Sequence, residues 1–266
     1  MLIDTHCHLD FPEFDKDREL VIRAAEENGV DCIINIGSSL AGSINSVALS
    51  KKYPQIFAVV GCHPHDAKDF SEEDFKAVAA LAGNEKVVAI GEIGLDYYRN
   101  LSPQDKQRDL FIRFIHLAKE LDLPAVIHSR DADSDTLDII KTNGLKKAVV
   151  HCFSSGEHFL KEVLDLGFYV SFTCNITYKK AQRLRDIVKI APVERVFLET
   201  DAPYLPAEGY RGKRNEPWFV RILAQEIARI KGISFDEVSR VTTENAKRFF
   251  KISYGSGMSM RGNPGM

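Results

Sequence analysis

Two histidines near the start of the chain, His6 and His8, have the spacing that points most directly to chemistry. On an extended strand, side chains two positions apart lie on the same side, so both imidazoles face one way and Cys7 faces the other. Neutral imidazole is the commonest protein ligand for divalent metal ions. A lone histidine more often caps the end of a strand through a hydrogen bond, but this pair predicts a metal site.

Four more candidate metal ligands stand where short apolar runs end. They are Glu92, His128, His151 and Asp201. With His6 and His8 they make six ligands of mixed imidazole and carboxylate type, which exceeds the four that one zinc ion takes and suits two ions. Glu92 is placed to bridge both ions with its two oxygens. The alternative for Glu92 is a salt bridge inside the fold.

The apolar runs that precede these residues predict buried parallel strands. Their centres lie 20–36 residues apart, which is the length of a βα unit. The runs are Leu2–His6, Cys32–Ile36, Phe57–Gly61, Val87–Glu92, Ala125–His128, Ala148–His151, Phe168–Phe172 and Val196–Glu199. Eight such units without a linker predict an α/β fold of one domain, a (β/α)8 TIM barrel over residues 1–252. A doubly wound open sheet is the competing fold, but the Gly-rich first turn that often accompanies it is missing here. Active sites of TIM barrels lie at the carboxyl ends of the strands, where these ligands fall.

Three serine motifs predict where helices begin. Ser71-Glu72-Glu73-Asp74 and Ser102-Pro103-Gln104-Asp105 resemble capping boxes, the second with proline at the first helical position. Ser234-Phe235-Asp236-Glu237 is expected to open the last helix in the same way. Two other histidines, His116 and His158, lie inside helical stretches and are expected to have no part in the site.

Composition excludes several classes of protein. The 266 residues are 44% hydrophobic and 27% charged, with a formal net charge of −3, so the chain has a globular balance and no general basic surface for duplex DNA. No segment has the length of a membrane span or the pattern of a secretory signal. Five cysteines without a Cys-x-x-Cys pair argue against a disulfide framework or a thiolate zinc site and favour the cytoplasm. Residues 253–266 lack periodicity and are predicted to be a disordered tail or an expression remnant.

Seven motifs together resemble the TatD family of metal-dependent deoxyribonucleases, within the amidohydrolase superfamily of TIM barrels. They are Asp4-Thr5-His6-Cys7-His8, Gly61-Cys62-His63-Pro64, Gly91-Glu92-Ile93-Gly94-Leu95-Asp96, His128-Ser129-Arg130, His151-Cys152-Phe153-Ser154, Glu199-Thr200-Asp201-Ala202-Pro203-Tyr204 and Arg211-Gly212-Lys213-Arg214-Asn215-Glu216-Pro217. Any one of them is a weak signal, but all seven occur in order over about residues 1–252. The resemblance implies an enzyme that hydrolyses phosphodiester bonds of DNA, on single strands or fraying ends.

The resemblance also sorts the ligands between two divalent ions. It implies that His6, His8 and Asp201 hold one ion, that His128 and His151 hold the other, and that Glu92 bridges them. It implies Mg²⁺ or Mn²⁺ in activity with Zn²⁺ also found, whereas imidazole-rich ligands favour zinc or a later transition metal on chemical grounds. Asp201 either accepts the proton of the attacking water or serves as a ligand alone.

Further residues are predicted to act on the substrate. His63 is expected to contact a phosphate oxygen or to transfer a proton, the alternative being that it orders a neighbouring loop. Arg130 is placed to pair with a phosphate, or with Asp131 or Asp133 on the surface. Arg211 and Arg214, in a basic run after the last strand, are expected to attract phosphates; the alternative is a solvated loop. Tyr204, like Tyr97 and Tyr98, is expected to stack on bases or to pack against the barrel.

Two residues beside the ligands, and two rival functions, complete these expectations. Asp4 and Glu199 are expected to support the ligands through hydrogen bonds.

A related two-metal barrel could instead hydrolyse an amide, a lactone or another small ester, but such relatives commonly carry a carboxylated lysine where Glu92 stands. A metal-stabilised binding barrel without catalysis is the third possibility. No membrane and no obligate protein partner are expected.

Overall fold

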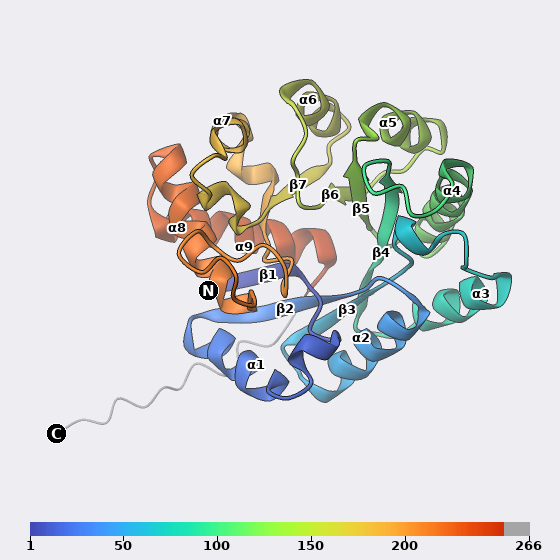
Figure 1. Cartoon of the computed structure of the whole chain (residues 1–266), viewed down its shortest axis with the longest axis horizontal. Helices are drawn as coiled ribbons and strands as arrows, with labels where there is room; N and C mark the ends of the chain where they lie inside the picture. The colour runs from blue at the N-terminus through green and yellow to red at the C-terminus, as the bar shows by residue number, and fades with distance from the viewer. Residues whose placement is uncertain (253–266) are drawn as a thin grey trace.

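Eight parallel strands alternate with helices around a barrel in the computed structural model, which describes residues 1–252 (Figure 1). Each strand pairs with its neighbours in sequence, in the order β1 to β8. The strands are β1 (Leu2–Cys7), β2 (Val30–Gly37), β3 (Ile56–Val60), β4 (Val87–Asp96), β5 (Ala125–Arg130), β6 (Ala148–Val150), β7 (Tyr169–Phe172) and β8 (Val196–Leu198). The (β/α)8 barrel predicted from the sequence is confirmed. The predicted tail, 253–266, lies outside the described residues.

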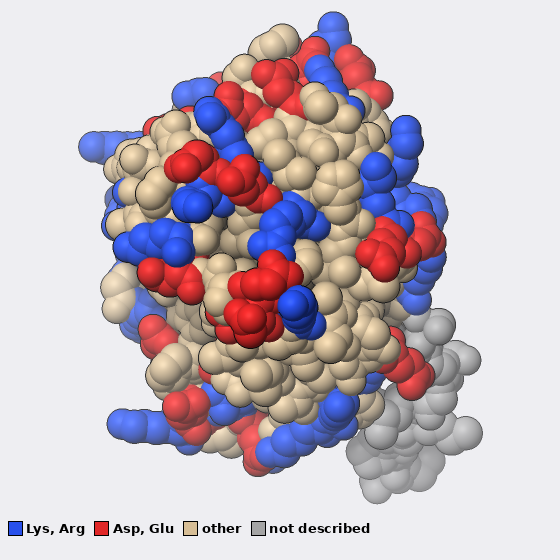
Figure 2. All heavy atoms as spheres, turned by 90° about the vertical axis from the view of Figure 1, so that its right-hand side faces the viewer, with Lys and Arg blue, Asp and Glu red and all other residues tan. Residues whose placement is uncertain are grey.

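Helices surround the sheet and cover its outer face (Figure 1). They are α1 (Arg18–Glu27), α2 (Leu40–Lys52), α3 (Glu72–Leu81), α4 (Gln104–Glu120), α5 (Asp133–Thr142), α6 (Glu157–Asp165), α7 (Gln182–Ile190), α8 (Val220–Lys231) and α9 (Phe235–Phe250). Among the helices of residues 1–252, none has both the length and the apolar character that crossing a bilayer requires. On the face drawn in Figure 2, basic and acidic side chains are interspersed, in keeping with the small net charge.

Backbone hydrogen bonds close the barrel between its last and first strands. The amide of Asp201 donates to the carbonyl of His6 at 2.8 Å, and the amide of His8 donates to the carbonyl of Ala202 at 2.8 Å. Deeper in the same seam, Thr5 Oγ1 donates to the carbonyl of Leu198. The seam therefore brings together three of the predicted ligands, which lie at opposite ends of the sequence.

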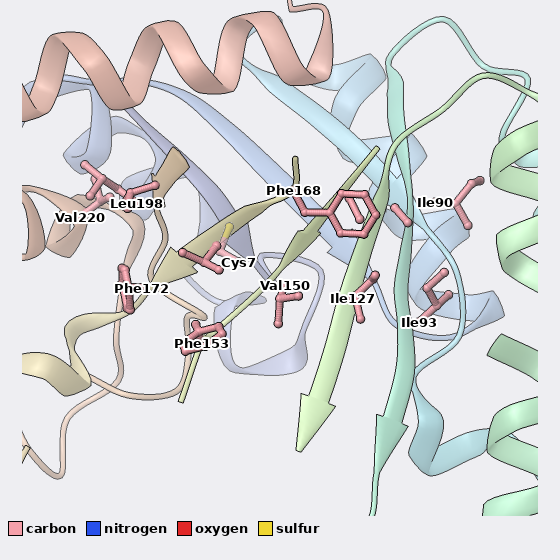
Figure 3. Close-up of a cluster of buried hydrophobic side chains, with 14 of the residues drawn as sticks. Cys7, Ile90, Ile93, Ile127, Val150, Phe153, Phe168, Phe172, Leu198 and Val220 are labelled. Atoms are coloured by element: carbon pink, nitrogen blue, oxygen red, sulfur yellow. The ribbon is translucent and has the colours of Figure 1, made fainter. Parts of the chain in front are cut away.

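Alternating side chains fill two apolar layers, one inside the barrel and one beneath the helices. Val126 belongs to the interior cluster and Ile127 to the outer one, so His128 points into the barrel. Figure 3 shows the outer layer, where Leu198 of β8 is drawn beside Val220 of α8. Phe250 of α9 joins the interior cluster and closes the amino-terminal end of the barrel. The opposite end is left for the predicted ligands.

The helix starts agree with the serine motifs in two of three cases. Ser71 and Asp74 form the reciprocal capping box at the start of α3, and Ser234 accepts the amide of Glu237 at the start of α9. The prediction for Ser102 is wrong, because α4 has Pro103 at its N-cap and no side-chain cap. Ser102 Oγ instead donates to the carbonyl of His65 and accepts the amide of Lys68. The hydroxyl of Ser102 therefore forms tertiary hydrogen bonds and does not cap the helix.

Strand β4 differs most from its predicted length. It continues past Glu92 to Asp96, which pairs with Arg130 of β5. The pairing of the two strands shifts in register between Ile90 and Ile93, so Glu92 lies at an irregularity inside the strand and not at its end. Register shifts of this kind re-aim side chains and are frequent next to active sites.

Gly94 permits the close approach of β4 to β5 beside these residues. Its φ is +138°, and a Cβ added there would overlap the carbonyl oxygen of His128. Only glycine adopts such a backbone without strain.

We expect Gly94→Ala to lower the free energy of unfolding by roughly 2–4 kcal/mol, from backbone strain and displacement of β5 together. Urea denaturation in excess chelator measures this without a contribution from bound metal. Gly209→Ala is the matched control, because a Cβ there meets no atom within 4 Å. Equal stability of the two variants would contradict the role assigned to Gly94.

Candidate metal centre

The six predicted ligands converge at the carboxyl end of the barrel. His6 lies in β1, Glu92 in β4 and His128 in β5. His8 and His151 directly follow β1 and β6, and Asp201 lies in the seam, three residues after β8. His6 is 0% exposed and Glu92 3%, so the centre lies below the protein surface. The structure therefore brings all six side chains together at one end of the barrel, as the sequence analysis expected.

One oxygen of Glu92 faces His6 of β1 and His8, which directly follows that strand. Glu92 Oε2 lies 3.5 Å from His6 Nε2 and 3.9 Å from His8 Nε2. Asp201 Oδ1 lies 3.7 Å and 3.5 Å from the same two nitrogens, which are 3.3 Å apart. Ligand atoms around a tetrahedral ion with bonds of about 2.0–2.1 Å are separated by about 3.3 Å. These atoms therefore stand at separations that suit a shared cation.

The other oxygen of Glu92 faces a second set of imidazoles. Glu92 Oε1 lies 2.7 Å from His151 Nε2, 2.9 Å from His128 Nδ1 and 3.4 Å from His63 Nε2. His128 Nδ1 and His151 Nε2 are 3.1 Å apart. His63, which the sequence assigned to substrate and not to a metal, thus lies with Glu92 and His128 in a group able to hold an ion.

The charge distribution of the cluster is that of a cation site. Burial opposes ionisation of Glu92, but the charges of His151 and His63 and a hydrogen bond from His128 hold the pKa of its carboxyl well below the usual value. Burial likewise opposes protonation of His8, yet Asp201 and Glu92 raise its pKa to about 9. Without a cation, protons bound to the imidazoles have to lie between the facing lone pairs of the histidine nitrogens and the carboxylate oxygens. A divalent cation would satisfy the same lone pairs, so the donor set fits one.

Asp96 and His65, which the sequence analysis did not assign to the site, lie directly behind the second group of imidazoles. Asp96 Oδ2 is 2.8 Å from His65 Nε2 and 3.3 Å from His128 Nε2. Asp96 is 1% exposed, and its amide donates to Gln107 Oε1. A carboxylate that holds the far nitrogen of a ligating histidine sets its orientation and tautomer. The signal was present in the sequence, since Asp96 follows Glu92 by four residues in one motif.

The two carboxylates expected to support the ligands do so differently. Glu199 Oε1 lies 3.7 Å from His151 Nδ1 and accepts the amide of Cys152. Asp4 accepts hydrogen bonds from the backbone of His6 and from the amide and hydroxyl of Thr200. Asp4 therefore supports the barrel seam, whereas Glu199 stands behind an imidazole.

Aromatic rings border the centre on the β1 side. Phe11 stacks on His8 at 4.6 Å between ring centroids, and Tyr204 meets Phe11 edge-on at 6.2 Å. Tyr204 is 51% exposed. Phe11 was not among the predicted site residues, although it follows His8 by three positions, where a turn returns it toward the histidine.

The three predicted basic residues differ in the groups that they contact. Arg130 lies over the ring of Tyr98 at 4.1 Å, in place of an ion pair with a neighbouring aspartate. Arg211 is exposed and lies over the ring of Tyr178. Arg214 donates two hydrogen bonds to Asp17, at 2.8 and 2.7 Å, and one to Glu216. Its binding of substrate stays a prediction that this arrangement does not favour, because its donors are taken by carboxylates.

Comparison with known proteins places the chain among hydrolases of one family. The family model described as TatD related DNase matches residues 3–251. An uncharacterized metal-dependent hydrolase of Bacillus subtilis (strain 168), YabD, is 41% identical, over 95% of this chain and 100% of its own length. The 3'-5' ssDNA/RNA exonuclease TatD of Erwinia tasmaniensis is 34% identical, over 94% of this chain and 100% of its own.

A solved structure agrees with these sequence relatives. The TatD homologue YjjV of Escherichia coli K12 superimposes with a TM-score of 0.91 at 30% identity, over 95% of this chain and 98% of that one. Matches of this extent include the whole barrel and every strand that bears a candidate ligand. The chain therefore belongs to the TatD related DNase family, a family of metal-dependent hydrolases.

Proposed function

We propose that this protein hydrolyses phosphodiester bonds of DNA, on single strands or fraying ends, with two divalent ions per chain. The observation that carries the proposal is the position of Glu92. Its two oxygens face separate groups of imidazoles, which is how a carboxylate bridges two ions. The relative named as an ssDNA/RNA exonuclease supports a nucleic-acid substrate.

His6, His8 and Asp201 would hold one ion, His128 and His151 the other, and Glu92 both. Bound ions would supply the polarisation of phosphate oxygens and the acidification of a water molecule. Magnesium or manganese is the proposed ion in activity and zinc is an alternative, because the donor set is rich in imidazole.

The protein's own groups then move protons and orient the substrate. Asp201 faces His6 and His8 with Oδ1, which leaves Oδ2 to accept the proton of the attacking water. His63 lies 3.4 Å from Glu92 and is 15% exposed, so its ring can reach a phosphate oxygen or the leaving oxygen at the mouth of the barrel. Phe11 and Tyr204 are placed to stack on an unpaired base.

The proposed setting is the cytoplasm. All five cysteines, including the buried Cys7 and Cys174, are free thiols. Free buried thiols are usual in a reducing compartment.

Glu92→Gln keeps the volume of the side chain and removes its charge. We expect bound metal to fall from two ions per chain, and cleavage of single-stranded DNA with Mn²⁺ to fall at least about 100-fold, because the amide cannot bridge two cations. Elemental analysis and cleavage of an end-labelled strand measure the two effects. His116→Gln, an exposed histidine on α4, is the control and should change neither.

The same assay separates the rival functions. Cleavage that persists in Glu92→Gln or after chelation would assign the activity to a contaminant and count against the proposal. Far more efficient hydrolysis of a lactone or an amide would indicate the related class of enzyme. Tight metal binding without turnover of any ester or amide would indicate a binding barrel.

Asp96→Asn tests the support behind His128. We expect metal affinity and activity to fall about 10–100-fold, because the amide loses the charge that holds His65 and His128 in place. Metal titration and initial rates measure this loss, with circular dichroism to show that the fold is kept. Asp135→Asn, which removes a carboxylate bonded to Tyr97 and Arg108, is the matched control. If both variants lose the same amount, the effect belongs to surface charge and not to His128.

A further inference from the structure

A cleft of about 320 Å³ lies at the rim of the barrel, outside the candidate metal centre. Its lining includes Tyr98, Arg130, Asp133, Ser155 and Arg183. These residues come from the ends of β4 and β5, from the start of α5, from the segment before α6 and from α7. None of them is among the candidate metal ligands.

The cleft adjoins the centre through the strands that carry its ligands. Arg130 ends β5 two residues after His128, a distance of about 7 Å along a strand. Ser155 follows His151 by four residues, after the neighbouring strand β6. A chain of phosphates that leaves the centre on the His128 and His151 side therefore meets this cleft next.

The N–H donors of the two guanidinium groups in the cleft have no protein acceptors within the described residues. Within residues 1–252, neither Arg130 nor Arg183 forms a side-chain hydrogen bond or an ion pair. Nearby Arg108, by contrast, donates to Tyr97 and Asp135. Both arginines are exposed, and the ring of Tyr98 lies against the Arg130 guanidinium at 4.1 Å without using its N–H groups.

The amino-terminal ends of two helices lie beside the arginines. Arg183 Nη2 lies against Gly156, the N-cap of α6, and neither α5 nor α6 has a side-chain N-cap. A guanidinium beside the positive end of a helix is unfavourable until an anion accepts hydrogen bonds from both. Two carboxylates, Asp131 and Asp133, also line the cleft, and Asp133 Oδ1 accepts a hydrogen bond from Ser155 Oγ at 2.7 Å.

We propose that this cleft binds a phosphate of the polynucleotide that flanks the bond being cleaved, held by Arg130 and Arg183 together. This inference rests on the proposed nuclease function. It assigns Arg183, which no sequence motif marked, to recognition of the strand. The cleft would make the enzyme favour substrates that extend beyond the two nucleotides joined by the scissile phosphate.

Arg183→Ala tests the proposal first by binding, with the full chain in excess chelator and a fluorescent eight-residue oligothymidylate as probe. We expect Kd to rise about tenfold at low salt, because a charge-assisted phosphate contact is lost. The slope of log Kd against log salt should fall by about 0.7, the value for one contact to a single strand. Arg240→Ala, an exposed arginine on α9 at the other end of the barrel, is the control and should match the wild type.

The second readout is the preference for length. The ratio of kcat/KM for the eight-residue strand to kcat/KM for thymidylyl-thymidine should fall about tenfold in Arg183→Ala, since the dinucleotide has no flanking phosphate. If the wild type cleaves DNA but Arg183→Ala keeps both the salt slope and this ratio, the cleft proposal is overturned and the nuclease proposal stands. If the wild type neither binds nor cleaves the strand, both are overturned.

Discussion

Closure of the sheet between its last and first strands is the constraint on which the candidate centre depends. The amide of Asp201 donates to the carbonyl of His6, and the amide of His8 donates to the carbonyl of Ala202. Because the partners in this seam are backbone atoms, the three side chains are positioned by the hydrogen-bond ladder and not by a mobile loop. Asp4 strengthens the seam from below by binding the backbone of His6 and Thr200. The place where the barrel closes is also the place where half of the predicted ligands meet.

Glu92 imposes the second constraint, which is electrostatic. Burying an ionised carboxylate costs several kcal/mol unless opposite charge surrounds it. Here imidazoles from β1, β5 and the ends of β3 and β6 face its two oxygens, and neighbouring carboxylates raise the pKa of His8, His128 and His151 in turn, whereas burial lowers the pKa of His6 and His63. Asp96 and Glu199 extend this pattern outward, behind His128 and His151. Carboxylate and imidazole layers thus alternate from the centre to its supports, an arrangement suited to holding cations and costly for a core that served stability alone.

The same strands that carry ligands also place the residues proposed to hold substrate. Arg130 follows His128 on β5, Ser155 follows His151 after β6, and Tyr204 follows Asp201 after β8. Each lies only two to four residues along the chain from a candidate ligand, so chemistry and recognition share one end of the barrel. The basic residues on that rim differ in their freedom, however. Arg214 is neutralised by Asp17 and Glu216, whereas Arg130 and Arg183 line a cleft with their donors unused within the described residues. This difference, and not the number of positive charges in a segment, separates a structural arginine from a candidate phosphate ligand.

Local pattern was sufficient for the elements and for the type of each ligand. Apolar runs indicated eight strands and their order, because burial of a parallel sheet leaves that signature in consecutive residues. The His, Glu or Asp residues that end most of these runs indicated the rim on which the ligands fall. The motifs also matched the TatD family, which the comparisons confirm. Contacts between distant segments lay beyond such reasoning. The register shift that places Glu92 inside β4, the approach of His63 to Glu92, the support of His128 by Asp96 and the capture of Ser102 by His65 each depend on how neighbouring strands and loops pack. Sequence motifs record which groups are available, whereas only the closed barrel decides which of them come within bonding distance.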